Sequence, residues 1–472
     1  MHPRRRLSRA ALLPLWAALA FLATPLAACG DDGGDGGGGD DIADRLAAID
    51  GMRVAEVTDD IPEANRRPGY RYFELHYQQP ADHDAAGGAT FEQYITLSHR
   101  DVTAPMVLHT HGYANGRQFR LTEPASLLSA NQITVEHRFF GQSRPEPADW
   151  SKLTLEQEAK DLHAIVEALK PIYGASWIST GASKNGETSL FHRRFFPDDV
   201  DGTVAYVAPL MTSLYDPRFA TILDQFGEPG CREALRTFQR TALEHHAAME
   251  ERAAAQPDAL YTTVGVARAA ETAIVEAEWA FWQYNGYMEC DSVPPATASD
   301  DDLFAFLDRV SPVDTYVDEG VLAFEPYYYQ VLDQLGYGEL NYQHLADLMQ
   351  FDYEDLTPFL PTAPTPDYSA DAVRDVLDWI ARDGDRLLLV YGEWDPWTAA
   401  RVDLGAAQDS FSFTAASIGH WASIGRLAVA DRSKALERLS AWSGVTAMFP
   451  SVREADRPDP EQLRRERPLR PR

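Results

Sequence analysis

The stretch STGASKNGET, residues 179–188, decides how this chain is interpreted. It follows a short apolar run and leads into a segment with a helical pattern. Ser183 has a glycine two positions before it, but Asn185 stands two positions after it and Gly186 follows one position later. A serine flanked by small residues between a strand and a helix is typical of a nucleophile elbow, whose tight turn lifts the hydroxyl to the edge of a sheet. The same letters also fit an ordinary Ser/Gly loop, so the rest of the chain must decide.

The sequence on both sides of this stretch alternates strands with helices. Residues 70–98 predict two strands joined by a Gly-rich turn, and APMVLHTHG (104–112) and QITVEHRFFG (132–141) are typical of buried parallel strands. Residues 154–174 predict a helix, which begins with a Thr-x-x-Gln capping box and places its leucines, isoleucine and valine on one face. GTVAYVAPLM (202–211) predicts another strand. This spacing predicts βαβ units, and therefore an α/β fold with a mostly parallel sheet and helices on both faces.

The pattern changes after the strand that ends near residue 211. The following segment is mainly helical and contains no convincing buried strand until the Pro-rich TPFLPTAPTPDY (357–368). Alternation then resumes with a helix at 371–382 and the strands RLLLVYG (386–392) and SFSFTAAS (410–417). We therefore expect an α/β-hydrolase fold with an inserted helical cap. Its expected parts are a first α/β segment at 46–212, the cap at 213–360, a second α/β segment at 361–450 and a loose tail at 451–472.

A serine hydroxyl at neutral pH needs a general base, and the base needs a carboxylate to orient it. In α/β-hydrolases these residues follow the chain order Ser, acid, His. Asp395 comes just after the strand 386–392, and His420 lies in a loop of small residues after the last strand. Both positions fall at the carboxyl ends of strands, where open α/β sheets build their sites. Ser183, Asp395 and His420 are therefore the predicted catalytic triad; Glu393 is the alternative acid.

The early loop HTHGYANG (109–116) is where this fold keeps donors for an oxyanion. We expect the backbone amides of Tyr113 and of Lys184, the residue after the serine, to form the oxyanion hole. The Lys184 side chain fits a surface position at the start of a helix as well as a catalytic role. His109 and His111 alternate on a strand and could mimic metal ligands, but packing is the favoured interpretation. No metal and no cofactor is implied.

The first 28 residues have the composition of an export signal. Four arginines precede the apolar stretch 10–28, which ends in LAAC (26–29). Cys29 directly after the small residues resembles the bacterial lipoprotein box, in which this cysteine is lipidated; a plain secretory signal is the alternative. The Gly/Asp-rich residues 29–45 suit a flexible tether. We expect an exported protein of the bacterial cell envelope, held by a lipid anchor or secreted.

Charge and cysteine content restrict the partners. The formal net charge is −30, with 42 basic and 72 acidic residues, which argues against nucleic acid and against adsorption to anionic lipid. Any contact with a membrane is therefore expected only through the lipid anchor. Cys231 and Cys290 remain as an even pair in an exported chain, so a disulfide is expected; two free buried thiols are the alternative. The oligomeric state is not predicted.

Several further stretches carry a resemblance to a known family. They are THGY (110–113), EHRFFGQSRP (136–145), TGASKNGET (180–188), EPYYYQ (325–330), YGEWDPW (391–397) and the late histidine loop. Together they resemble the secreted bacterial prolyl tri/tetrapeptidyl aminopeptidases, serine peptidases distantly similar to Pro-X carboxypeptidase and dipeptidyl-peptidase II. The resemblance covers roughly residues 70–445. It implies release of short peptides from a free N-terminus after proline, under a helical cap, with the same three triad residues.

The chain departs from this family at two positions. Asn185 stands where a glycine is usual, and Trp421 stands where a glycine usually follows the histidine. These departures leave the triad whole but put the rate and the width of the leaving-group pocket in question. An esterase or lipase with the same triad, or a non-catalytic surface binding protein on a hydrolase fold, are the alternatives. EAEWAFWQY (276–284) offers aromatic rings for a proline and acids for a substrate ammonium, although ordinary cap core is the favoured interpretation.

Overall fold

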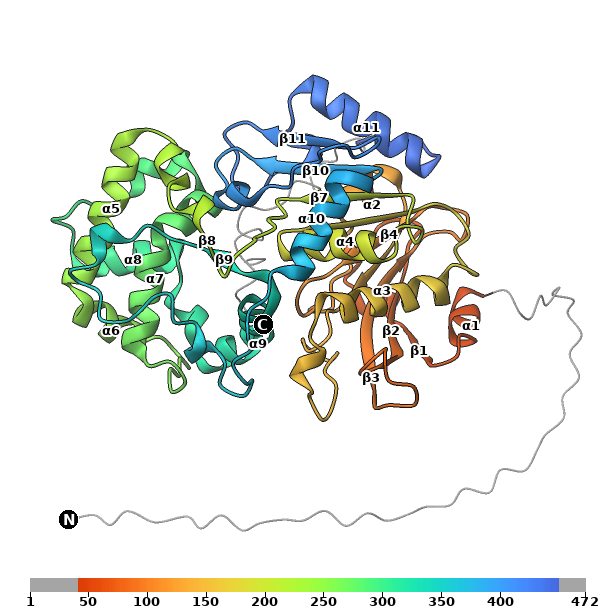
Figure 1. The fold of residues 1–472 in the computed structure, drawn as a ribbon, viewed down its shortest axis with the longest axis horizontal. Coiled ribbons are helices and arrows are strands. Elements are labelled where there is room, and N and C mark those ends of the chain that lie inside the picture. The colour runs from red at the N-terminus through yellow and green to blue at the C-terminus, as the bar shows by residue number, and fades with distance from the viewer. Residues whose placement is uncertain (1–40, 450–472) are drawn as a thin grey trace, which may run out of the picture. The chain divides into compact units, whose positions relative to one another are not determined.

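The computed structural model describes residues 41–449, apart from the side chains of residues 287 and 288. The signal, most of the tether and the C-terminal tail predicted above therefore lie outside the described residues. One large sheet organises the α/β part (Figure 1). Its strands, in spatial order, are β1 (Met52–Glu56), β2 (Arg71–Pro80), β3 (Thr90–His99), β5 (Asn131–Val135), β4 (Met106–Thr110), β6 (Trp177–Ala182), β7 (Gly202–Tyr206), β10 (Leu387–Gly392) and β11 (Phe411–Ala415).

The sheet is antiparallel at one edge and parallel elsewhere. The pairs β1–β2, β2–β3 and β3–β5 are antiparallel, whereas every pair from β5 through β11 is parallel. Strand β4 follows β3 in the chain but pairs with β5 and β6, so the chain crosses over before the parallel region begins. An antiparallel entry followed by a parallel sheet with interleaved helices is the predicted α/β-hydrolase arrangement.

Alternation along the strands explains why helices cover both faces of the sheet. In β10, Leu387 and Leu389 pack with one apolar cluster, and Leu388 and Val390 pack with another on the opposite face. All four of these side chains are fully buried. The helices of one face are α1 (Ile42–Ala47), α3 (Leu155–Leu169), α4 (Lys184–Phe195) and α10 (Asp371–Asp383); those of the other are α2 (Glu123–Leu128) and α11 (Val429–Ser443).

Helix α3 forms as its sequence predicts. The Thr154 hydroxyl accepts a hydrogen bond from the Gln157 amide at 3.3 Å, which caps the helix. The predicted apolar face of leucines, isoleucine and valine is buried against the sheet. The Gln157 side chain does not complete the capping box; its amide group bonds the carboxylates of Asp82 and Asp84 in the turn between β2 and β3. The helix start and this turn are therefore tied together.

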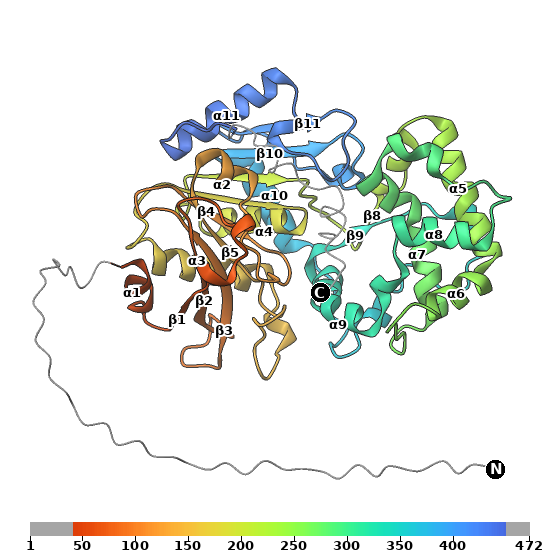
Figure 2. The ribbon, with the colours of Figure 1, turned by 180° about the vertical axis from the view of Figure 1, so that it is seen from behind.

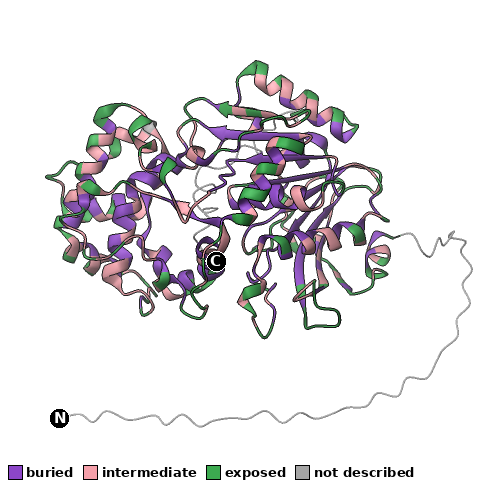
Figure 3. Ribbon diagram, in the orientation of Figure 1, coloured by how far each residue is buried: buried purple, intermediate pink, exposed green. Residues whose placement is uncertain are grey.

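The segment between β7 and α10 is mostly helical and lies beside the α/β layer rather than over either helical face (Figures 1 and 2). Its helices are α5 (Pro229–Glu244), α6 (His246–Ala254), α7 (Val266–Ala280), α8 (Asp300–Val310) and α9 (Asp318–Gln330). They share an apolar core, which appears as the buried inner faces in Figure 3. The expectation of no strand here was wrong in one detail, because β8 (Tyr215–Asp216) pairs in parallel with β9 (Tyr337–Gly338).

Two helices of this cap end in a wider turn. A π-helical turn at Phe281–Asn285 follows α7, and another at Val331–Leu335 follows α9. Each is closed by a glycine with positive φ, 73° at Gly286 and 75° at Gly336. Such turns are rare in proteins overall, but those that occur are often found at functional sites. Both of them border the cavity described below.

A disulfide joins Cys231 at the start of α5 to Cys290, with 59 residues of sequence separation. It lies within the cap and closes a loop that contains α6 and α7. Among residues 41–449, no helix combines the length and apolar character that a bilayer crossing requires.

Candidate active site

Ser183 occupies a sharp turn between β6 and α4. Its backbone lies at φ 58° and ψ −132°, a conformation that a residue with a side chain rarely adopts. The Ser183 amide donates to the Tyr206 carbonyl of β7 at 2.9 Å, and the Ser183 carbonyl accepts from the Glu187 amide at 3.0 Å. The turn is therefore held by the neighbouring strand on one side and by the helix on the other. This is the geometry that the elbow interpretation requires.

Small residues beside the serine are a steric requirement. A Cβ added to Gly181 would lie 2.2 Å from the Asn185 carbonyl oxygen, and one added to Gly186 would lie 2.9 Å from the Ala208 side chain. The close approaches that demand glycine thus fall at positions 181 and 186. Position 185 itself accommodates a side chain, which explains why Asn185 does not disturb the elbow.

Asp395 precedes the last strand in the chain and His420 follows it, and the two side chains are hydrogen-bonded to each other in the structure. Asp395 follows β10 and is fully buried. Its Oδ2 lies 2.8 Å from His420 Nδ1, and its Oδ1 accepts the Trp397 amide at 3.3 Å. The alternative acid, Glu393, is exposed and accepts the Ser417 amide at 2.6 Å. The histidine is therefore oriented by Asp395 and not by Glu393.

His420 also contacts the cap. Its amide donates to the Gln283 carbonyl at 2.8 Å, and its ring lies edge-on to Tyr284 with centroids 5.8 Å apart. Gln283, Tyr284 and Ser183 line one cavity. Among residues 41–449, no hydrogen bond joins the Ser183 hydroxyl to His420. Bonds between nucleophile and base are often long before substrate binds, and the pairing of Ser183 with His420 stays a prediction.

The loop predicted to bind the oxyanion is held by the elbow. The Gly112 amide donates to Asn185 Oδ1 at 2.7 Å, and Lys184 Nζ donates to the Gly112 carbonyl at 2.5 Å. A Cβ on Gly112 would lie 2.8 Å from Asn185 Oδ1, so this position also requires glycine. Asn185, a departure from the family pattern, thus links the two halves of the expected oxyanion hole.

The two predicted oxyanion donors differ in their surroundings. The Tyr113 amide lies 3.3 Å from His111 Nδ1, but the shorter contact of that nitrogen, 3.1 Å, is with the Tyr113 carbonyl, so the amide is at most weakly engaged and an incoming oxygen can replace the contact. The Lys184 amide belongs to the first turn of α4, where the helix offers no acceptor of its own. Donors at a helix start are suited to developing negative charge.

The Lys184 side chain is buried, so the surface interpretation was wrong. Besides its bond to Gly112, Nζ lies 5.2 Å from the ring centroids of both Tyr113 and Phe140. Burial lowers the pKa of Lys184 to about 7, against the opposing attraction of Glu158 and Glu187. Burial likewise raises the pKa values of these two carboxyls to about 8. Lys184 and Glu187 line the same cavity as Ser183, and Glu158 interacts with Lys184 from outside it.

Sequence reasoning did not find Glu187. It follows Ser183 by four residues on α4, so it lies one helical turn from the serine and lines the same cavity. The i+4 spacing was the available signal. Trp397, two residues after Asp395, lines this cavity as well and was also missed.

Two other conspicuous stretches have structural roles. The Glu136 carboxylate accepts the amides of Asn115, Gln142 and Ser143, which fixes the turns around the site. The buried Arg138 guanidinium pairs with Asp161 of α3 through contacts of 2.7 and 2.8 Å. His109 Nδ1 lies 3.3 Å from the Thr134 hydroxyl, and burial lowers the pKa of His109 to about 3. The EHR motif and the paired histidines therefore shape the loops.

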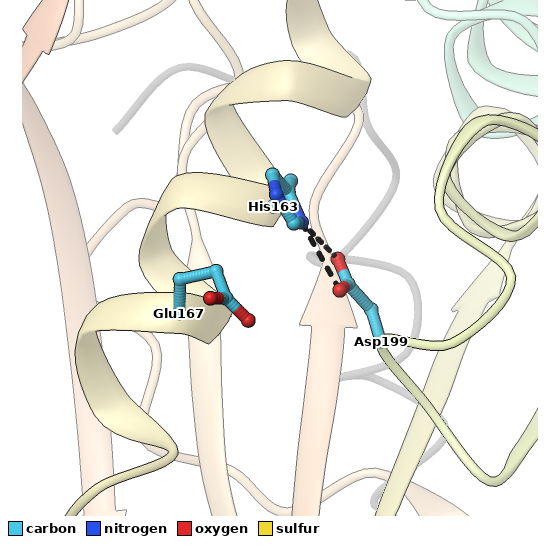
Figure 4. Close-up of side chains that lie close together, drawn as sticks. All are labelled: His163, Glu167 and Asp199. Atoms are coloured by element: carbon cyan, nitrogen blue, oxygen red, sulfur yellow. Dashed lines mark hydrogen bonds and ion pairs between the residues drawn. The ribbon is translucent and has the colours of Figure 1, made fainter.

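One cluster has side chains of metal-ligating type. In the part of the chain that is described, only His163, Glu167 and Asp199 bring three such groups within 4.8 Å of one another (Figure 4). His163 Nδ1 lies 2.9 Å from Asp199 Oδ2, and His192 Nε2 lies 2.9 Å from the same oxygen. The His163 ring also stacks on Phe196 at 4.0 Å. Hydrogen bonding and stacking account for this arrangement, and the expected lack of a metal stays a prediction.

Comparisons with known proteins find a family model and relatives that match this chain. The family model described as PS-10 peptidase S37 matches residues 38–459. A prolyl tri/tetrapeptidyl aminopeptidase of Streptomyces mobaraensis is 38% identical over 416 residues, which cover 86% of this chain and 85% of that protein. A Caenorhabditis elegans protein named as a serine protease is 26% identical over 40% of this chain and 37% of its own. A proline iminopeptidase of Mycobacterium smegmatis superposes with a TM-score of 0.39 at 13% identity, covering 78% of this chain and 98% of its own.

Proposed function

Because the chain belongs to the PS-10 peptidase S37 family, we propose that it releases tripeptides and tetrapeptides after proline from peptides with a free N-terminus. The named activity of the Streptomyces relative supports this substrate class. The observation that carries the proposal is the Asp395–His420 bond, which orients the histidine beside the cavity that Ser183 lines.

The mechanism we propose uses three side chains and two backbone amides. His420 takes the proton of the Ser183 hydroxyl as the hydroxyl oxygen attacks the carbonyl carbon of the substrate proline. Asp395 fixes the imidazole tautomer and stabilises its charged form. The amides of Tyr113 and Lys184 stabilise the oxyanion, with Tyr113 giving up its contact to His111. His420 then protonates the leaving amine, and water releases the peptide from the acyl-enzyme.

The buried surroundings of the elbow favour this role over a non-catalytic one. Ser183 is held in a strained backbone conformation by glycines on both sides, and such strain persists mainly where function requires it. A binding protein without chemistry would gain nothing from a serine held in this way.

A fluorophosphonate probe tests the nucleophile directly. We expect covalent labelling of the wild-type protein and none of Ser183→Ala. Turnover of Ala-Ala-Pro p-nitroanilide should then greatly exceed turnover of p-nitrophenyl butyrate. Labelling with ester turnover alone would indicate an esterase, and an unlabelled, folded protein would indicate a non-catalytic one.

We also propose that the protein is an exported lipoprotein anchored through Cys29. The arginine-led apolar leader and the LAAC sequence support this localisation. In a bacterial host, the wild-type protein should sediment with membranes and Cys29→Ser should not. Equal distribution of both proteins in the soluble fraction would favour plain secretion.

A further inference from the structure

The cavity beside Ser183 has an acidic side chain that the proposed mechanism does not use. Glu276 belongs to α7 of the cap and lines the cavity together with Ser183. Trp279, Ala280 and Gln283, at helical spacing from Glu276, line it as well. One face of α7 therefore forms a wall of this cavity, and Glu276 lies on that face.

Phenol hydroxyls bind the Glu276 carboxylate. The Tyr316 hydroxyl donates to Oε2 at 2.7 Å, and the Tyr353 hydroxyl donates to Oε1 at 2.8 Å. An ionised carboxylate has about four acceptor positions, so acceptor positions remain for a ligand. Burial raises the pKa of Glu276, while the two phenols favour the charged form and fix its orientation.

Glu276 has no cationic partner. Within residues 41–449, no lysine, arginine or histidine forms an ion pair with it, and Lys184 is the one basic side chain among the described residues that line the cavity. Lys184 is already engaged by the Gly112 carbonyl and lies between Glu158 and Glu187. An enclosed carboxylate without a counter-charge is costly, and a cationic ligand would relieve that cost.

We propose that Glu276 binds the α-ammonium group of the peptide substrate and thereby sets the length of the released peptide. This proposal rests on the proposed function. An extended peptide spans about 3.3–3.6 Å per residue, so the N-terminus of a tripeptide lies roughly 10 Å from the carbonyl under attack, and that of a tetrapeptide about 13 Å away.

Glu187 is the rival anchor in the same cavity. It lies one helical turn from Ser183, a rise of about 6 Å, which suits the ammonium of a shorter product. It also lies next to Lys184, whose charge competes with an incoming ammonium. Tyr328, Tyr337 and Trp279 line the cavity around Glu276 and add faces on which a cation is stabilised. Glu276 is thus the better candidate for the anchor, because no basic side chain among residues 41–449 forms an ion pair with it and aromatic rings line the cavity beside it.

The proposal is tested by removing the substrate amine and the Glu276 carboxylate, first separately and then together. Ala-Ala-Pro p-nitroanilide and propionyl-Ala-Pro p-nitroanilide have the same length and differ only by the amine. For the wild-type protein, kcat/KM should be about 10- to 100-fold higher with the free amine, the range expected for a hydrogen-bonded charge pair. In Glu276→Gln this preference should disappear, because only the free-amine substrate loses a charge pair.

Glu278→Gln is the matched control, because Glu278 is a buried acid of the same helix that pairs with Arg236. It should keep the amine preference. The proposal would be overturned if Glu276→Gln kept the full preference for the free amine. It would also be overturned if only Glu187→Gln lost that preference. Should Glu276→Gln not fold, the wild-type protein still decides, because equal kcat/KM for the two substrates contradicts any ammonium anchor. Failure of the proposed function itself would appear differently, as a labelled serine that cleaves neither anilide.

Discussion

The elbow and the cap wall line one cavity but are held by different interactions. At the elbow, backbone contacts decide the structure, since a single added Cβ at Gly181 would lie 2.2 Å from a carbonyl oxygen. In the cap, side chains decide it, through tyrosine hydroxyls on Glu276 and a disulfide between Cys231 and Cys290. The elbow therefore has no room for a larger residue at Gly181. The cap depends on its hydroxyl groups and its covalent link in addition to its apolar core.

The largest expected effect comes from breaking the cap alone. Replacing Cys231 and Cys290 with serine frees a loop of 59 residues and should lower the free energy of unfolding by about 4 kcal/mol. Denaturant unfolding with and without a reducing phosphine measures this. The phosphine should destabilise the wild-type protein and leave the double variant unchanged; equal sensitivity of both would show that the link does not stabilise the cap.

Breaking the elbow alone comes next. Gly181→Ala places a methyl group against the Asn185 carbonyl, which must displace the serine, and displacements of about 1 Å can cost roughly 100-fold in rate. Assays with Ala-Ala-Pro p-nitroanilide should show a loss of at least that size. Gly230→Ala in the cap is the control, because nothing lies within 4 Å of its added Cβ. Similar activity of the two variants would contradict the contrast.

A smaller effect is expected at the link between elbow and oxyanion loop. Asn185→Gly restores the residue usual in the family but removes the acceptor of the Gly112 amide. We expect kcat to fall about 5-fold with KM nearly unchanged, since one neutral hydrogen bond contributes roughly 1 kcal/mol. Asn185→Asp keeps an acceptor at this position and should therefore keep most of the wild-type rate. A faster Asn185→Gly enzyme would mean that the asparagine restrains the loop unproductively.

A pH dependence of stability is also expected at Glu187, one helical turn from the serine. The pKa of Glu187 is raised to about 8 in the folded protein, so its contribution to stability is full below the ordinary value of 4.5 and is lost as pH rises towards 8. Glu187→Gln lacks this loss, so the Tm of the variant relative to wild type should increase from pH 4.5 to pH 8. Calorimetry across this range measures it, and Glu233→Gln, an exposed cap position, should give a flat difference.

Much of the fold followed from local patterns, because those patterns report burial. The capped start of α3 at Thr154 and the alternating strand β10 needed only periodicity and turn chemistry. The burial of Lys184 did not follow from the sequence, because its partners are a carbonyl at Gly112 and rings at Tyr113 and Phe140, on loops that approach only after folding. The β8–β9 pair was missed because two-residue strands leave no period to detect.

The site could be predicted to a similar extent and for related reasons. Asp395 and His420, chosen from chain order and strand ends, lie 2.8 Å apart, and their catalytic role stays a prediction. Contacts between distant loops could not be predicted, as shown by the two departures from the family pattern. Asn185 bonds Gly112, and Trp421 donates to the Tyr284 carbonyl at 3.2 Å. At each position, where the family usually has glycine, the side chain forms a hydrogen bond to a residue far away in the sequence.

The π-helical turn after α7 ties the position of His420, the proposed base, to the cap. Its Gln283 carbonyl accepts the His420 amide, and a Cβ on Gly419 would lie 2.6 Å from that carbonyl. Lineages that exchange cap residues to admit new peptides must therefore preserve this one turn, or lose the alignment of the base. Diversity among relatives should concentrate in the outer cap helices and be scarce where the turn meets the histidine loop.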